Sequence, residues 1–170
     1  MKKAVFSPTL AVVLIIVVNF VTQVGAEPGK LDPTFGFEGV TLVDFGGLED
    51  LPNAAALQDD GKILVSGWVN IWPGDFGTVR LLSDGSLDSS FGSGGKVTTA
   101  FSDNPDNVDA AWSVTAGPNG RVYVSGETCD ADYFICEVAT AVYKEDGSLD
   151  ETFAGDGKTS VSPGTDTVYA

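Results

Sequence analysis

The sequence predicts an all-β fold made of tandem four-stranded antiparallel units. Three observations lead to this prediction. A motif that begins with Leu-Asp recurs three times, the segments between its copies are rich in Val, Ile, Thr, Tyr and Leu, and short Asp-Gly or Asn-Gly turns separate those segments. No stretch keeps the 3.6-residue spacing of an amphipathic helix, so strands are the expected elements throughout.

The Leu-Asp motif sets the period of the repeat. Its three copies are LDPTFGFEGV (31–40), LDSSFGSGGKV (87–97) and LDETFAGDGKT (149–159), which are 56 and 62 residues apart. Two further pairs of segments match between the copies: DGKILVSG (60–67) with NGRVYVSG (119–126), and RLLSDGSLD (80–88) with VYKEDGSLD (142–150). Periods of this size are typical of repeat proteins in which each unit buries its faces against its neighbours.

Each unit is expected to contain four strands joined by tight turns. The predicted strands lie at 40–45, 53–58, 62–69 and 78–83 in the first unit, and at 96–101, 110–116, 121–127 and 134–144 in the second. Turns at 59–61 and 118–120 join the second and third strands, because Asp-Gly and Asn-Gly allow the positive φ that a tight hairpin needs. Similar turns at 84–86 and 146–148 follow the fourth strand.

The Leu-Asp motif itself is interpreted as a connector between one sheet and the next. Its Gly residues permit a sharp reversal, and Asp88 and Asp150 suit backbone capping within the loop. Leu and Phe are expected to anchor each connector in the core, as the pairs Leu31 with Phe35, Leu87 with Phe91, and Leu149 with Phe153. Outside the connectors, Trp112, on the second strand of its unit, is also expected in the core. A ligand site repeated once per unit is the alternative interpretation.

Together these segments resemble a known family. LDSSFGSGGKV, DGKILVSG and RLLSDGSLD, recurring in the same order over residues 31–163, are similar to the delta-60 repeat, which is found in tandem in exported bacterial proteins. The resemblance implies a propeller-like β structure and export, and it brings no catalytic residues. The second unit departs from the repeat in its Cys-containing insertion and in VATAVYKEDG, where the first unit has GTVRLLSDG.

The expected organisation is a signal peptide at 1–26 followed by a single β-repeat domain at 27–170. Two lysines precede the apolar run LAVVLIIVVNFV, and VGA at 24–26 suits cleavage; an uncleaved membrane anchor is the alternative. Units that start near residues 31, 87 and 149 give about two complete blades and the start of a third. Closed propellers use about four to eight blades. The chain is therefore expected to be a truncated part of a propeller, to oligomerise, or to form an open stack of two sheets.

Composition excludes several classes of function. The chain has 9 basic and 24 acidic residues, and loss of Lys2 and Lys3 with the signal peptide changes the formal charge from −15 to −17, since 7 − 24 = −17. Such a surface repels nucleic acid and anionic membranes, and no membrane span is expected after cleavage. Without His, the chain lacks Ser-His-Asp and Cys-His catalytic groups. GDGKT at 155–159 lacks the spacing of a phosphate-binding loop.

Cys129 and Cys136 are the only cysteines of the chain. In an exported protein they are expected to form a disulfide that closes a hairpin loop, with free thiols or a metal-binding pair as alternatives. The expected localisation is secreted, periplasmic or at the cell surface.

Two groups of residues are candidates for ligand binding. Asp103, Asp106 and Asp109 offer oxygen ligands for an irregular Ca²⁺ site, although the run lacks the Gly and Glu of an EF-hand loop, and a solvated turn is the alternative. Trp68, Asn70 and Trp72 share one face if their strand continues, which would suit stacking against a sugar. No cofactor is expected other than Ca²⁺ at this candidate site.

The function expected from these observations is that of a non-enzymatic exported scaffold or binding module, with a protein or carbohydrate partner. The alternative is an extracellular carbohydrate-active enzyme, or a fragment of one, that uses paired carboxylates.

Overall fold

The structure is a computed structural model that describes residues 28–46, 49–70, 74–104, 106–132, 135–162 and 164. The chain divides into two units, Met1–Lys30 and Leu31–Ala170, and all strands found in the described residues belong to Leu31–Ala170. The predicted signal peptide at 1–26 lies outside the described residues. Within the described ranges, no helix is long and apolar enough to cross a membrane.

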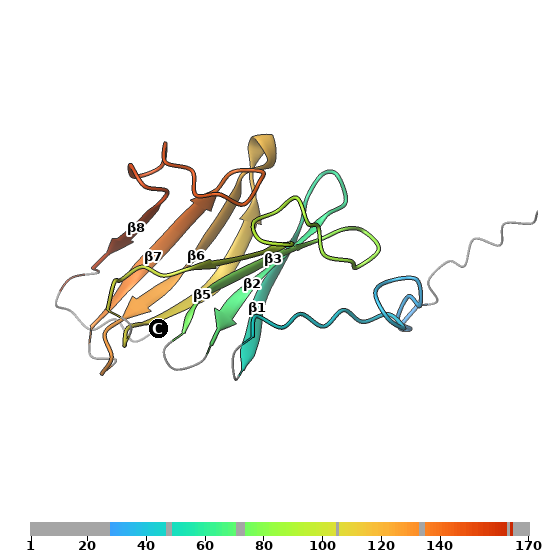
Figure 1. The fold of residues 1–170 in the computed structure, drawn as a ribbon, viewed down its shortest axis with the longest axis horizontal. Coiled ribbons are helices and arrows are strands. Elements are labelled where there is room, and N and C mark those ends of the chain that lie inside the picture. The colour runs from blue at the N-terminus through green and yellow to red at the C-terminus, as the bar shows by residue number, and fades with distance from the viewer. Residues whose placement is uncertain are drawn as a thin grey trace, which may run out of the picture. The chain divides into compact units, whose positions relative to one another are not determined.

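Two four-stranded antiparallel sheets are formed by the described residues of Leu31–Ala170 (Figure 1). This confirms the predicted fold class. In each sheet the strands lie in sequence order. The first sheet contains β1 (Asp50–Leu57), β2 (Ile63–Val69), β3 (Asp75–Leu81) and β4 (Lys96–Thr99). The second sheet contains β5 (Val108–Ala116), β6 (Val122–Cys129), β7 (Cys136–Tyr143) and β8 (Lys158–Val161).

The structure corrects the role of the connector. Residues 96–101 were expected to open the second sheet, but β4 pairs with β3, with Lys96 opposite Val79 and Thr99 opposite Phe76. In the same way β8 pairs with β7 and closes the second sheet. The second and third copies of the Leu-Asp motif therefore each join the third and fourth strands of one sheet. Local sequence could not show this, because β-propensity identifies a strand but not its partner.

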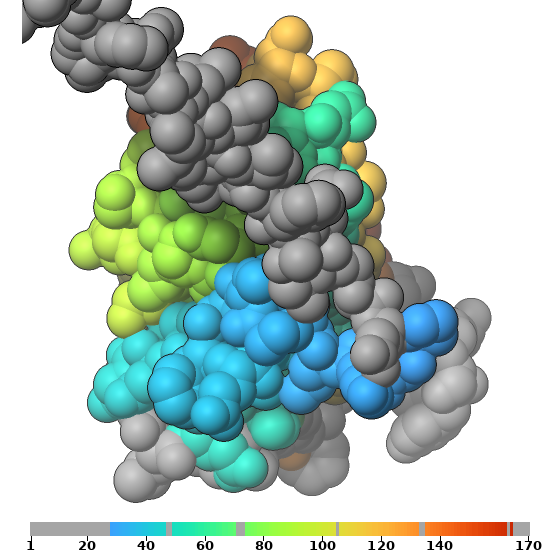
Figure 2. Space-filling model, turned by 90° about the vertical axis from the view of Figure 1, so that its right-hand side faces the viewer, coloured from blue at the N-terminus to red at the C-terminus, as the bar shows by residue number. Residues whose placement is uncertain are grey.

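The predicted first strand at 40–45 is also corrected. Residues 41–45 belong to neither sheet and line a groove together with residues of β2 and β3. This segment precedes β1 as β4 precedes β5, so it is the repeat equivalent of β4. Figure 2 shows the chain before β1, in blue and cyan, on one face of the molecule.

The core lies between the facing surfaces of the two sheets. Leu64 and Phe76 of the first sheet pack with Val122, Val124 and Tyr143 of the second, and all five are buried. The Tyr143 hydroxyl forms a 2.8 Å hydrogen bond with the Thr99 hydroxyl, so it also links the two sheets. Burial raises the pKa of Tyr143 to about 12, which keeps the phenol neutral.

Not every predicted core residue is buried. Phe91 is fully buried as predicted, and its ring contacts Tyr143 edge to face with the centroids 6.5 Å apart. Leu31 is exposed, because the first copy of the motif lies outside both sheets. Trp112 is half exposed, and its predicted core position is wrong. A β-bulge between Ala111 and Ser113 shifts the register at this residue and turns the indole outward.

Candidate functional site

Each copy of the Leu-Asp motif folds into the same polar turn. In the second copy, Asp88 Oδ1 accepts hydrogen bonds from the Ser90 backbone N–H at 3.1 Å and from the Ser90 hydroxyl at 2.6 Å. The other copies form the same two bonds, from Thr34 to Asp32 and from Thr152 to Asp150. The predicted capping role of Asp88 and Asp150 is confirmed. The bond from the Thr152 hydroxyl contributes most to lowering the pKa of Asp150.

Backbone hydrogen bonds also link each of the first two connectors to the Asp-Gly-Ser turn that follows it in the chain. The Gly36 N–H donates to Asp84 O at 2.7 Å, and 56 residues later Gly92 N–H donates to Asp146 O at the same distance. A Cβ atom on Gly147, the residue after Asp146, would lie 2.5 Å from Gly92 N. The Asp-Gly-Ser turns therefore recur because a preceding connector docks on each of them too closely for a side chain.

Arg80 is a cation buried between the sheets, with only 2% of its surface exposed. Its Nε donates to Asp88 Oδ2 at 2.8 Å, Nη1 to Glu145 O at 2.6 Å and Nη2 to the Ser90 hydroxyl at 3.1 Å. The guanidinium also lies over the ring of Phe91, 4.7 Å from its centroid. Burial acts to raise the pKa of Asp88, but the bonds from Ser90 and the charge of Arg80 outweigh it and lower that pKa.

Arg80 was not among the residues predicted from the sequence, because Arg is usually a surface residue. The sequence pattern of β3 could have indicated its burial. Successive side chains of a strand point to opposite faces, so Arg80 lies on the same face as Phe76 and Thr78. In the second sheet Val142 takes the equivalent position, 62 residues later. There Asp150 pairs instead with Arg121, whose side chain is 42% exposed, with Nη2 2.7 Å from Oδ2.

A second pair of repeated carboxylates closes the loop before each sheet. Asp50 Oδ2 accepts from Phe45 N–H at 2.8 Å, and 59 residues later Asp109 Oδ2 accepts from Phe101 N–H at 2.6 Å. Asp109 is buried, and its Oδ1 has no hydrogen-bond partner in the described part of the chain. Burial, and to a lesser extent the charge of Asp109, raises the pKa of Asp75. In the sequence, this repeated role could have been recognised from the 59-residue spacing of Asp50 and Asp109, which matches the repeat.

The predicted Ca²⁺ ligands differ in their surroundings. Asp103 and Asp106 are exposed, whereas Asp109 is buried at the start of β5. Within the turn, Asn104 Nδ2 donates to Asn107 Oδ1 at 2.9 Å. The structure therefore gives Asp109 a loop-closing bond that the two exposed carboxylates do not share.

The predicted sugar platform lies at the C-terminal end of β2. Trp68 is half buried, and its Nε1 is a buried donor that has no partner among the described residues. The indole lies against Gly74, where a Cβ atom would come within 1.5 Å of Nε1. Asn70 follows the strand with a positive φ of 54°. Trp72 lies outside the described residues.

The predicted disulfide between Cys129 and Cys136 is confirmed. The two residues stand opposite each other at the ends of β6 and β7. The bridge therefore closes the neck of this hairpin, as expected from the short spacing.

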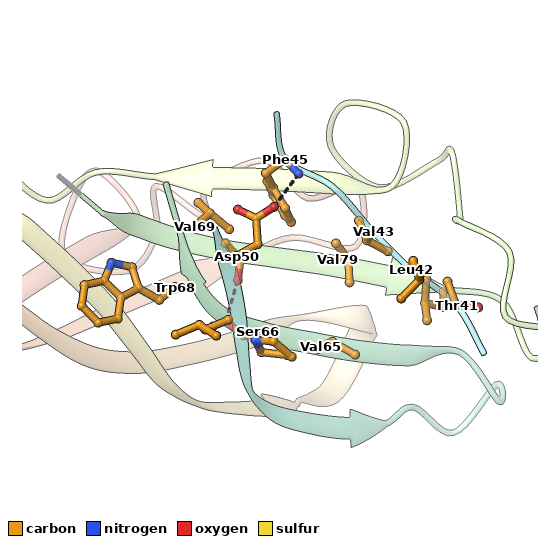
Figure 3. A pocket seen from close by; sticks show the side chains of 15 residues that line it. Thr41, Leu42, Val43, Phe45, Asp50, Val65, Ser66, Trp68, Val69 and Val79 are labelled. Atoms are coloured by element: carbon orange, nitrogen blue, oxygen red, sulfur yellow. Dashed lines mark hydrogen bonds between the residues drawn. The ribbon is translucent and has the colours of Figure 1, made fainter. Parts of the chain in front are cut away.

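An apolar groove lies on the outer face of the first sheet, the face turned away from the second sheet. Its volume is about 270 Å³, and segment 41–45 forms one wall. Val65 and Val79 line it from β2 and β3 (Figure 3), together with Leu81. In Figure 3 the dashed line from Phe45 N to Asp50 shows how the segment is held at one end.

Comparison with known proteins agrees with this architecture. Residues 58–91 match a family model described as "Domain of unknown function (DUF5122) beta-propeller". The matched segment includes β2, β3 and the connector as far as Phe91, and so contains Arg80 and Asp88. No curated protein and no solved structure gives a significant match. Over residues 58–91 the chain is thus similar to a propeller-like family of β repeats.

Proposed function

We propose that the protein is an exported, non-enzymatic scaffold of the delta-60 kind, which assembles by packing the outer face of its first sheet against another sheet of the same repeat. The disulfide supports export, because such bonds persist in oxidising compartments. The family match supports a propeller-like repeat, in which sheets stack on one another.

The observation that carries the proposal is that two equivalent sheet faces have different neighbours, a whole sheet in one case and the single segment 41–45 in the other. In the second sheet Val124, Ala141 and Tyr143 are fully buried against the first sheet. Their counterparts, 59 or 62 residues earlier, are Val65, Val79 and Leu81, which line the groove beside segment 41–45. Val79 and Leu81 are buried there, and Val65 is partly exposed. The repeat thus supplies an example of what covers this face, namely a neighbouring β-sheet.

Exposed leucines extend the groove. Leu57 stands opposite Ile63, which stands opposite Leu81, so the three side chains lie on one face of the sheet. Leu57 is 70% exposed, and Leu42, in the wall of the groove, is 92% exposed. An apolar surface of this kind is typical of an interaction site. The simplest partner is a second copy of the chain.

Sedimentation velocity over a range of protein concentrations tests the proposal. We expect the wild-type protein to self-associate and Leu57→Lys to remain monomeric with an unchanged Tm. The matched control is Val161→Lys, which changes an apolar residue on β8 that is 62% exposed and is expected to leave association intact. A wild-type protein that stays monomeric, or a Leu57→Lys variant that still associates, would contradict the proposal.

A further inference from the structure

Three side chains of the kinds that bind metal ions meet at the end of the β6–β7 hairpin. The donor atoms of Glu127, Cys129 and Cys136, a carboxylate oxygen and two sulfurs, all lie within 4.8 Å of one another. Over the ranges that the structure describes, no other three His, Cys, Asp or Glu side chains meet this closely. In a tetrahedral zinc site with bonds of about 2.0–2.3 Å, the donor atoms stand about 3.3–3.8 Å apart. Small side-chain rotations would therefore bring these three donors onto one ion.

The strands of the second sheet fix these three positions. Cys129 stands opposite Cys136 at the end of the ladder, and Glu127 lies two residues before Cys129 on the same face of β6. Val124, three residues before Glu127, points to the other face and is buried against the first sheet. Because β5 and β8 flank the hairpin, the ladder keeps the two sulfurs near each other even when no bond joins them.

The repeat itself does not require metal-binding residues at these places. The equivalent positions of the first hairpin, 59 or 62 residues earlier, are Trp68, Asn70 and Gly74. The first hairpin nevertheless forms the same antiparallel ladder between β2 and β3. The group of one carboxylate and two sulfurs is therefore specific to the second hairpin and is not a consequence of the fold.

Solvent reaches this group from the outer face of the second sheet. Cys129 is 2% exposed and forms the floor of the group, whereas Glu127 and Cys136 are partly exposed. The chain carries a formal net charge of −15, which attracts cations to its surface. Thiolates bind Zn²⁺ well, whereas Ca²⁺ and Mg²⁺ prefer ligand sets made only of oxygen. The group therefore suits a Zn²⁺ ion that arrives from solvent.

In the oxidised protein the two sulfurs are bonded to each other, so they cannot act as thiolate ligands. We propose that reduction of the Cys129–Cys136 disulfide converts the end of the hairpin into a zinc site formed by both thiolates and the Glu127 carboxylate. A dithiol supplies the two electrons and becomes a disulfide, while Cys129 and Cys136 become thiols. Zn²⁺ then displaces one proton from each thiol, and a water molecule completes the tetrahedral set. The redox state of the hairpin thus decides whether it holds a disulfide or a metal ion.

The test compares the oxidised and reduced forms of the full protein. A phosphine reduces the disulfide and becomes a phosphine oxide, and Co²⁺ is then added as a spectroscopic substitute for Zn²⁺. We expect the reduced protein to bind Co²⁺ with thiolate-to-metal charge-transfer absorption, and Zn²⁺ to displace the Co²⁺. Zn²⁺ should also restore much of the Tm that reduction removes, because it binds the folded hairpin in preference to the unfolded chain. Ca²⁺ should not restore it.

Two neighbouring carboxylates provide a variant and its matched control. Glu127→Gln removes one of the three protein ligands and should weaken Co²⁺ binding by at least about tenfold, since loss of a group that only orients a ligand already costs roughly 10- to 100-fold. Glu137→Gln should leave binding unchanged, because Glu137 follows Cys136 directly and points to the other face of β7. Replacing both cysteines with Ser should abolish the charge-transfer absorption while the circular dichroism of the sheets is retained.

The inference is overturned if the reduced protein shows no charge-transfer absorption with Co²⁺, or if the oxidised protein binds Co²⁺ as tightly as the reduced protein does. It is also overturned if Glu127→Gln and Glu137→Gln weaken binding equally, or if Ca²⁺ restores the Tm as well as Zn²⁺ does. None of these measurements depends on self-association, so they leave the proposed scaffold role untouched.

Discussion

Replacing Arg80 with Ala is expected to destabilise the protein by about 3 to 5 kcal/mol, because Asp88 would remain as an unpaired charge in the interior. The structure shows why the lower figure is a minimum. The substitution also removes the 2.6 Å bond to Glu145 O, which ties the second sheet to the first, and the contact with the ring of Phe91. For a domain of this size, the expected fall in Tm is about 10 °C or more.

Urea unfolding followed by circular dichroism measures this loss directly. Arg121→Ala is the matched control, because it removes the equivalent partner of Asp150 where the guanidinium is 42% exposed and water can replace it. We expect it to cost much less than Arg80→Ala. Adding Asp88→Asn to Arg80→Ala should recover part of the loss, since the interior then holds no unpaired charge.

The loss should also depend on pH. In the wild-type protein the pKa of Asp88 is lowered, so its ionised form stabilises the fold above the unfolded pKa, and this contribution disappears as the pH falls through the folded pKa. The difference between wild type and Arg80→Ala should therefore shrink in acid. A cost below about 3 kcal/mol at neutral pH, or a cost equal to that of Arg121→Ala, would refute the reasoning.

Three further predictions concern other parts of the fold. Gly147→Ala should lower the free energy of unfolding by at least about 1 kcal/mol more than Gly155→Ala does. Both residues have positive φ, but only at Gly147 would a Cβ atom clash with a docked connector, so equal melting temperatures would contradict the prediction. Replacing Cys129 and Cys136 with Ser should cost about 2.5 kcal/mol in urea unfolding for a ring of eight residues, and an unchanged midpoint would be inconsistent with this estimate. Asp75→Asn should raise Tm at neutral pH and not in strong acid, because a raised pKa costs stability as the pH rises above the unfolded value; a gain that is the same in acid would argue against that origin.

Local features of the fold could be predicted from the sequence. The Asp-Gly and Asn-Gly turns have the positive φ that was expected of them at Gly61 and Asn119, because φ depends on the residue itself and its immediate neighbours. The capping by Asp88 and Asp150 is local for the same reason, since each carboxylate bonds a residue two positions later. The short spacing of Cys129 and Cys136 also limited where their disulfide could form.

Contacts between distant segments were decided only by the tertiary structure. The sequence of Lys96–Thr99 shows a strand, but only the open edge at β3 determines the sheet to which it belongs. Arg80 is buried because Asp88 and Glu145 converge on it from elsewhere in the chain, and no local pattern carries that information. Period and turn chemistry are properties of neighbouring residues, whereas burial and binding surfaces depend on which segments the fold brings together.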